Sequence, residues 1–234
     1  MMTGNSPDMM LTEALAQYND WYVMRDILIP YEDRSMHIDF LLVAPFCLFI
    51  GEFKTYQGMI TGQAMNKYWK QYVSSNEIDY FSPVLQNLYH MRAMYDFLKP
   101  LHYEVHIHSV AFMHGLSPNC SIRVQGPYPP DSSIVTDMAA LRRVTQVVSE
   151  KQQMVLTPAE TKYLYDFIGE NQLRGDDARA RHARESSEYK LNARKALVQQ
   201  VCPECLSPLV PRGTPTGNYW VCSRYPECKY THKM

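Results

Sequence analysis

Three charged side chains in a largely apolar stretch carry the groups that phosphodiester chemistry needs. Asp39, Glu52 and Lys54 lie in residues 37–58, which read HIDFLLVAPFCLFIGEFKTYQG. Paired carboxylates suit a hard cation such as Mg²⁺, which takes one or two carboxylates, waters and substrate phosphate oxygens. A lysine beside them can position the attacking water or stabilise charge that develops at phosphorus. The alternative is a structural ion pair at a sheet edge, for which the same residue types also serve.

Two predicted strands position these groups. Residues 38–43 and 47–54 are β-branched, aromatic and aliphatic, and they flank Ala44-Pro45-Phe46. A tight turn at Pro45-Phe46 pairs Ala44 with Cys47 and sets Asp39 opposite Glu52. Because side chains alternate along a strand, one face carries Asp39, Leu41, Val43, Leu48, Ile50, Glu52 and Lys54, and the other carries Ile38, Phe40, Leu42, Phe49 and Phe53. Strands that are apolar on both faces are central and covered on both sides.

The segment IDFLLV, then FIGEFKTYQGMITG, Trp69 and FSPVLQNLYHMRAM, resembles the nuclease-related domain (NERD) family, a branch of the PD-(D/E)xK nucleases. The resemblance runs from about residue 11 to residue 116. It implies an α/β fold with a restriction-endonuclease-like central mixed sheet flanked by helices. It also implies that Asp39 and Glu52 hold Mg²⁺ or Mn²⁺, that Lys54 is the catalytic lysine, and that Gln86 is a polar helix residue near the site.

Two residues depart from the family pattern. Glu13 matches the acidic residue of the first helix, but without the Gly-Glu context that is usual there. Gly51 stands where a β-branched or aliphatic residue is more usual.

Gln86 and His90 lie four apart on one flank of a predicted helix, where they either face the sheet end or form polar contacts at the edge of the core.

Four cysteines near the end of the chain have metal-ligand spacing. Cys202, Cys205, Cys222 and Cys228 form C-x2-C-x16-C-x5-C, which can close a tetrahedral Zn²⁺ site. Unrelated buried cysteines and disulfides are the alternatives, and disulfides suit secreted chains. Residues 202–234 resemble the C4 zinc ribbon of type I bacterial topoisomerases, which implies a structural zinc ion and single-stranded DNA binding.

Aromatic and cationic residues interleave around these cysteines. Aromatic faces stack on unpaired bases, and cations follow the phosphates. We therefore expect nucleic-acid contacts from Arg212, Tyr219, Trp220, Arg224, Tyr225 and Lys229. Some of the aromatics must instead pack the ribbon. The other cysteines, Cys47 and Cys120, lie in apolar contexts and are predicted to be buried thiols.

Charge is unevenly divided along the 234 residues. From Arg174 onward there are eleven Lys and Arg against six Asp and Glu, which leaves the first 173 residues at net −6 within a total of −1. A basic end fits a polyanionic partner, and an acidic body fits a cation site.

No apolar run is long enough to span a bilayer, and no signal-peptide pattern precedes the first predicted helix, so we expect a cytoplasmic protein. No phosphate-binding loop or nucleophile-elbow serine occurs.

The chain is expected to divide into a nuclease-like domain (1–172), a solvated helical linker (173–200) and a zinc ribbon (201–234). Helices are predicted over 11–22, 83–99, 137–151, 157–170 and 174–200, the fourth opening with the capping box Thr157-Pro158-Ala159-Glu160. Strands are predicted over 23–29, 59–61 and 105–113. His106 and His108 alternate on the last strand, where an exposed or edge-strand pair is favoured over a metal site.

Together these features predict a metal-dependent endo- or exodeoxyribonuclease that its zinc ribbon tethers to DNA. Two alternatives stay open. In the first, the domain is a non-catalytic platform and only the ribbon touches DNA. In the second, the chain is an adaptor of a DNA-processing complex, such as one built around a topoisomerase or helicase.

Overall fold

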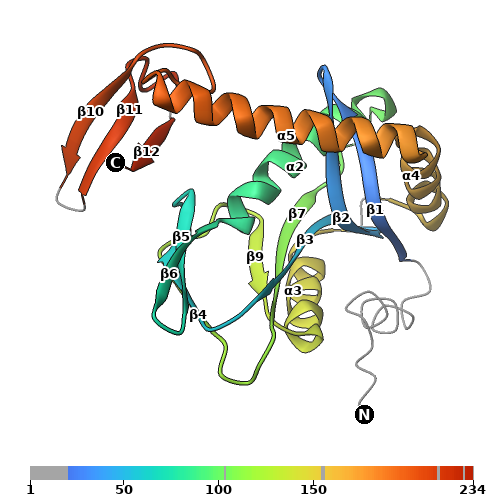
Figure 1. Cartoon of the computed structure of the whole chain (residues 1–234). Coiled ribbons are helices and arrows are strands. Elements are labelled where there is room, and N and C mark those ends of the chain that lie inside the picture. Colours follow the sequence, from blue (N-terminus) through green and yellow to red (C-terminus); the bar gives the residue numbers. More distant parts are fainter. Residues whose placement is uncertain (1–20, 103, 154–155, 215–216, 229, 234) are drawn as a thin grey trace. The chain divides into compact units, whose positions relative to one another are not determined.

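A computed structural model describes residues 21–102, 104–153, 156–214, 217–228 and 230–233 (Figure 1). The chain forms two compact units, Met1–Leu173 and Arg174–Met234, and each is described by itself. The division into three domains that the sequence indicates stays a prediction.

The first unit is built on a mixed five-stranded sheet with the order β1-β2-β3-β7-β9. Antiparallel pairing joins β1 to β2 and β2 to β3, whereas β3, β7 and β9 run parallel. The strands are β1 (Tyr22–Tyr31), β2 (Arg34–Ala44), β3 (Cys47–Tyr56), β7 (Ile107–Gly115) and β9 (Ser132–Val135). The central place of β2 and β3 confirms what their apolar faces predict.

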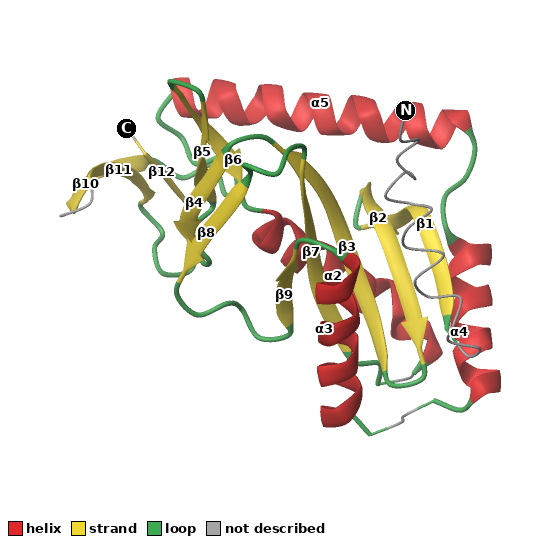
Figure 2. Ribbon diagram, turned by 90° about the horizontal axis from the view of Figure 1, so that it is seen from below, coloured by secondary structure: helices red, strands yellow, loops and turns green. Residues whose placement is uncertain are grey.

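Helices cover both faces of this sheet (Figure 2). Residues of α2 (Pro83–Leu98) and α4 (Pro158–Asn171) share one buried cluster with β1, β2 and β3, and residues of α3 (Met138–Lys151) pack in a second cluster with Phe40, Leu42 and Phe49. A 3-10 turn (Lys99–Leu101) follows α2. The capping box before α4 is present, with the Thr157 N–H donating to Glu160 at 2.8 Å. The expected α/β class, a mixed sheet flanked by helices, is confirmed.

A second sheet in the same unit was largely missed by sequence reasoning. Its order is β6-β5-β4-β8. The strands are β4 (Met59–Gln63), β5 (Tyr68–Val73), β6 (Asn76–Phe81) and β8 (Ser121–Gln125). Trp69 is fully buried in it, and its indole N–H donates to the Gln63 carbonyl at 2.9 Å. Only the beginning of β4 was expected, because the polar sequence of β5 and β6 lacks a clear alternation of apolar residues.

The hairpin of β2 and β3 has the predicted register, with Ala44 paired with Cys47 and Phe40 with Gly51. One residue lies on the wrong face: Ile38 packs in the cluster of Leu41 and Val43 rather than with Phe40. On the neighbouring strand, Asp26 has a φ of 52°. That left-handed residue breaks the alternation, so that Met24 and Ile27, the partner of Ile38, share the cluster.

Two other predictions need correction. Most of the helix expected over 11–22, with Glu13, lies outside the described residues, and Tyr22 already belongs to β1. The expectation of an exposed or edge-strand pair is wrong for His108, which is buried on β7 between β3 and β9, whereas His106 precedes β7 and is partly exposed. Sequence alternation cannot show which strands will pair on either side.

The second unit consists of a long helix and a small three-stranded sheet. The helix is α5 (Asp176–Val198), and the strands are β10 (Leu209–Thr214), β11 (Gly217–Cys222) and β12 (Thr231–Lys233), in that order. Among the described residues, no helix of either unit is both apolar and long enough to cross a membrane.

Candidate active site and zinc centre

The polar residues of the first unit meet where two paired strands separate. Pairing of β2 with β3 ends at Phe40 and Gly51. Beyond it, β2 continues along β1 to Arg34, and β3 continues along β7 to Tyr56. Asp39 occupies the parting point, where its Oδ2 accepts the Phe53 N–H at 2.7 Å. The carboxylate thus accepts a hydrogen bond from a backbone N–H of β3 that is no longer paired with the backbone of β2.

Gly51 is explained by its cross-strand partner. A Cβ at position 51 would lie 1.8 Å from the Phe40 Cζ atom, because the ring covers the glycine. Phe40 follows Asp39 and Gly51 precedes Glu52, so this close contact fixes the spacing of the strands beside both carboxylates.

Glu52 is the buried centre of the arrangement, with 3% of its surface exposed. Its Oε1 forms an ion pair with the Lys54 ammonium and accepts the Gln86 amide at 2.6 Å. Gln86 comes from α2, 34 residues along the chain, so tertiary packing brings it to the carboxylate. The structure therefore brings Glu52, Lys54 and Gln86 into direct contact, as the resemblance implies.

Burial shapes the electrostatics of this group. It raises the pKa of Glu52, and the charge of Asp39 raises it further, whereas Lys54 opposes both. His90, also from α2, places Nδ1 3.8 Å from Glu52 Oε2. Because burial lowers the pKa of His90 to about 3, this histidine is neutral at pH 7 and the contact is no ion pair.

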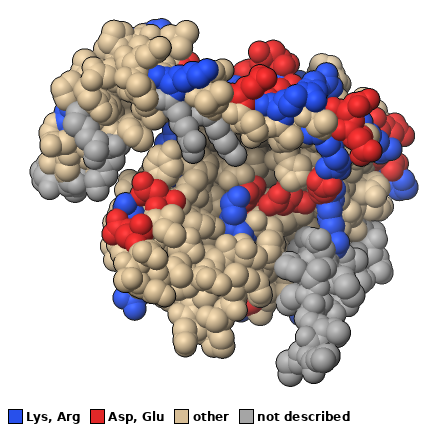
Figure 3. Space-filling view, viewed as in Figure 1, with Lys and Arg blue, Asp and Glu red and all other residues tan. Residues whose placement is uncertain are grey.

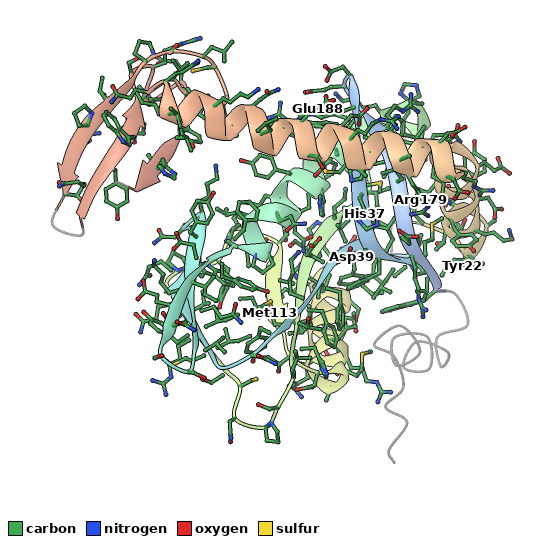
Figure 4. All side chains as sticks on the ribbon, in the orientation of Figure 1. Tyr22, His37, Asp39, Met113, Arg179 and Glu188 are labelled. Carbon is green, nitrogen blue, oxygen red and sulfur yellow. The ribbon has the colours of Figure 1, made fainter. Side chains whose placement is uncertain are left out.

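Sequence reasoning missed His37 and Asp26. His37 Nε2 lies 2.8 Å from Asp26 Oδ1, and its Nδ1 lies 3.5 Å from Asp39 Oδ1 (Figure 4). The imidazole thus connects Asp39 to a second carboxylate. A signal was present, since His37 and Asp39 are two apart on one strand; the position of Asp26 depends on the pairing of β1 with β2.

The carboxylates of Asp39 and Glu52 are of the ligand type that a hard divalent cation prefers. Asp39 and Glu52 each commit one oxygen to a donor within 2.7 Å, and each second oxygen faces a histidine nitrogen at 3.5 Å or 3.8 Å. Carboxylate oxygens of this kind are what Mg²⁺ and Mn²⁺ prefer. A cation there would also relieve the mutual repulsion of the two carboxylates.

Tyr80, at the end of β6, adds an unexpected polar group. Its buried hydroxyl has no hydrogen-bond partner among the described residues. Burial, followed by the charge of Glu52, raises its pKa to about 12. The hydroxyl therefore stays protonated and is available as a donor in the electrostatic range of Glu52.

The four cysteines of the second unit converge as their spacing predicts. Their sulfur atoms lie within 4.8 Å of one another, and two pairs approach more closely, Cys202–Cys228 at 3.6 Å and Cys205–Cys222 at 3.3 Å. Sulfurs bound tetrahedrally at about 2.3 Å from zinc would be about 3.8 Å apart. Hydrogen bonding by Ser207 lowers the pKa of Cys205 to about 6, which favours the thiolate that a metal needs. None of the four forms a disulfide in the structure, and their clustering agrees with a metal site.

The predicted nucleic-acid residues divide between two faces of the ribbon. Arg212 pairs with Tyr219 across β10 and β11, on the face opposite the zinc core. Arg212 and the exposed Tyr225 line one surface hollow. Trp220 instead packs partly against the zinc core. Arg224 is exposed in the following turn, and Lys229 lies outside the described residues.

The remaining cysteines differ from each other. Cys47 is buried, and burial raises its pKa well above the usual range, as expected for an inert thiol. Cys120 is only half-buried and has its sulfur 3.4 Å from the Ser117 hydroxyl, so the expectation of burial is wrong there.

Comparison with known families agrees with both resemblances. Residues 4–114 match the nuclease-related domain, and residues 199–234 match the topoisomerase DNA-binding C4 zinc finger. Neither a curated protein nor a solved structure matches the chain. Residues 4–114 are therefore similar to a nuclease-related domain, and residues 199–234 are similar to a C4 zinc ribbon of the DNA-binding topoisomerase type.

Proposed function

We propose that this protein is a metal-dependent nuclease that hydrolyses phosphodiester bonds of DNA and holds its substrate through the zinc ribbon. The observation that carries the proposal is the buried Glu52, which contacts both Lys54 and Gln86 beside Asp39 at the point where the strands part. A buried carboxylate with a raised pKa is expensive to maintain, and such groups cluster at functional sites.

Asp39 and Glu52 would hold Mg²⁺ or Mn²⁺, which when bound lowers the pKa of a water ligand and stabilises negative charge at phosphorus. Lys54 has 32% of its side chain exposed, so its ammonium can leave Glu52 and reach a water or a phosphate oxygen. Gln86 orients the Glu52 carboxylate by its 2.6 Å hydrogen bond. His37 orients Asp39 from the solvent side.

The ribbon would supply the DNA affinity. The described part of the nuclease-related unit shows both acidic and basic side chains in Figure 3 and presents no extended basic patch on that face. Arg212, Tyr219 and Tyr225 offer a cation and aromatic rings on the ribbon. This combination favours single-stranded DNA, because unpaired bases expose faces on which aromatics stack.

The test is cleavage of labelled single-stranded and duplex DNA by the zinc-loaded chain with Mg²⁺ or Mn²⁺. We expect metal-dependent cleavage that Asp39→Asn and Lys54→Ala each reduce by at least 100-fold, in line with the loss of one group that stabilises the transition state. DNA affinity should change little in either variant.

Matched controls use charged residues of the same unit that lie away from the site. Lys70→Ala removes a lysine paired with Asp79 at 2.6 Å, and Asp166→Asn removes a carboxylate paired with Lys162 at 2.6 Å. Both should cleave at the wild-type rate. Equal cleavage by the wild type and both site variants would reject the mechanism. Tight DNA binding without cleavage under either metal would favour the non-catalytic DNA-binding alternative.

A further inference from the structure

A second group of metal-binding side chains lies at the beginning of β7. One ligand atom from each of His106, His108 and Asp131 falls within 4.8 Å of the others. His106 Nε2 lies 3.3 Å from Asp131 Oδ1. These residues belong neither to the Glu52 site nor to the cysteine cluster.

His108 shows the second observation that points to a ligand. The residue is 8% exposed, and its buried Nδ1 has no hydrogen-bond partner among the described residues. Its other nitrogen, Nε2, lies 2.9 Å from the Ser133 hydroxyl. With Ser133 accepting the Nε2 proton, the lone pair of Nδ1 is left for another partner. A metal-bound histidine has this pattern, in which the second ring nitrogen is held by a hydrogen bond.

Backbone pairing brings the three residues together. His106 directly precedes β7, where its carbonyl accepts the Leu48 N–H at 2.8 Å, and His108 is the second residue of the strand. The β7–β9 ladder pairs Ser109 with Ser132, and the Ser109 N–H donates to the Asp131 carbonyl at 2.7 Å. Asp131 has a φ of 54°, which turns the chain just before β9. The carboxylate is thereby held beside the histidines rather than left on a loose loop.

The position separates this group from the proposed nuclease site. His108 pairs with Phe49, and Ala111 pairs with Glu52. Because His108 and Ala111 are three residues apart on β7, the two sites are about 10 Å apart along the strand direction, at 3.3 Å per residue. The His108 ring lies against Phe49, which packs with α3 on the sheet face opposite the Leu41 and Ile50 cluster.

We propose that His106, His108 and Asp131 form a second zinc-type metal site, which ties the edge strand β9 to β7. Two imidazoles and one carboxylate are a ligand set of three-ligand zinc centres, whose fourth position is taken by water. Ligand atoms at about 2.0–2.2 Å from zinc would be roughly 3.4 Å apart. Closing from 4.8 Å needs small side-chain rotations, and Asp131, with 46% of its side chain exposed, is free to make them.

Charged groups of both signs act on His108. Lys151, at the end of α3, is the opposing positive charge, and Asp131 offsets it. The buried thiol of Cys47 lies near this group but outside the three-residue cluster.

The experiment counts zinc bound to the full chain after saturation with Zn²⁺ and removal of excess ion, by elemental mass spectrometry. In the Asp39→Asn background, which removes a ligand of the other proposed metal site, we expect two equivalents in the parent and one after His106→Gln or Asp131→Asn. His114→Gln is the matched control, because it changes a histidine at the far end of the same strand and should keep two equivalents. Ser133→Ala should keep the site but weaken its zinc affinity by about 10- to 100-fold, as loss of an outer hydrogen bond does.

Cobalt substitution distinguishes the two centres. The cysteine cluster gives intense sulfur-to-cobalt charge-transfer absorption, and the second equivalent should add only the weak visible bands of nitrogen and oxygen ligands. A single equivalent in the Asp39→Asn parent under saturating Zn²⁺ would overturn the proposal. So would a second equivalent that both variants retain. Near-ultraviolet circular dichroism verifies that each variant is folded.

Discussion

The contact of Gly51 with Phe40 makes a sharp prediction about stability. An alanine at position 51 would place its Cβ at 1.8, 2.0 and 2.2 Å from three ring atoms of Phe40. Ordinary contacts of this kind are near 3.5–4.0 Å, so the ring or the strand must move by more than 1 Å. Phe40 is 3% exposed and packs among other buried side chains, so the ring cannot swing into solvent.

We expect Gly51→Ala to destabilise the first unit by about 3 kcal/mol, the upper end of the usual cost of overpacking a core. Phe40→Ala alone should cost about 3–5 kcal/mol because it leaves a cavity. In the Phe40→Ala background, however, Gly51→Ala should be neutral or stabilise by about 0.5 kcal/mol. There the new methyl group enters the cavity, and glycine's extra loss of backbone entropy on folding is removed.

The assay is urea denaturation of the four proteins, monitored by tryptophan fluorescence and by far-ultraviolet circular dichroism. Trp69 is fully buried in the first unit and reports its unfolding. Gly213→Ala is the control, since its added Cβ would lie 3.5 Å from the Asn218 side chain, an ordinary contact. The reasoning is refuted if Gly51→Ala costs less than about 0.5 kcal/mol, or if its effect is the same with and without the Phe40 ring.

Three further predictions concern other parts of the chain. His90 is 4% exposed, and burial lowers its pKa from 6.5 to about 3. Its contribution to the free energy of unfolding is therefore fully present above pH 6.5 and is lost as the pH falls toward 3. Between pH 6.5 and 4.5 this loss is about 2–3 kcal/mol. His90→Gln should abolish that part of the acid loss in denaturant titrations, and an unchanged pH profile would contradict it. Cys222→Ser should lose the ribbon zinc and weaken DNA binding, because metal binding supplies the folding free energy of such ribbons. The unfolding transition reported by Trp69 in the first unit should be unchanged. An unchanged DNA affinity, measured by fluorescence anisotropy, would contradict this prediction. Thr157→Ala should cost about 1 kcal/mol by removing the cap of α4, read from the denaturation midpoint, with Thr136→Ala as a control outside the helix.

Local sequence patterns predicted the parts of the molecule that neighbouring residues decide. The hairpin register follows from the turn at Pro45-Phe46, and the capping box follows from Thr157 and Glu160 being three apart. The helix over 83–98 follows from apolar residues at helical spacing. The resemblance added Gln86, which periodicity places on a helix flank without indicating its partner.

Failures of prediction occurred where a distant segment decides the outcome. Ile38 packs on the unexpected face, where its partner Ile27 follows the left-handed residue Asp26 of the neighbouring strand. His108 was assigned to an exposed or edge strand because no local signal shows that β9 pairs beside β7. Polar strands β5 and β6 escaped notice because their pairing, rather than their composition, makes them a sheet.

The sequence by itself indicated two kinds of chemistry, a carboxylate-lysine group suited to phosphodiester hydrolysis and a four-cysteine zinc site. Both signals are properties of short segments, so they can be read without the tertiary structure. Only the tertiary structure decided which residues share a site. It set Gln86 against Glu52, His37 against Asp39, and Asp131 beside His106, in each case through strand or helix packing. The physical reason is that a side chain's burial and charge depend on what packs against it, and those partners lie far away along the chain.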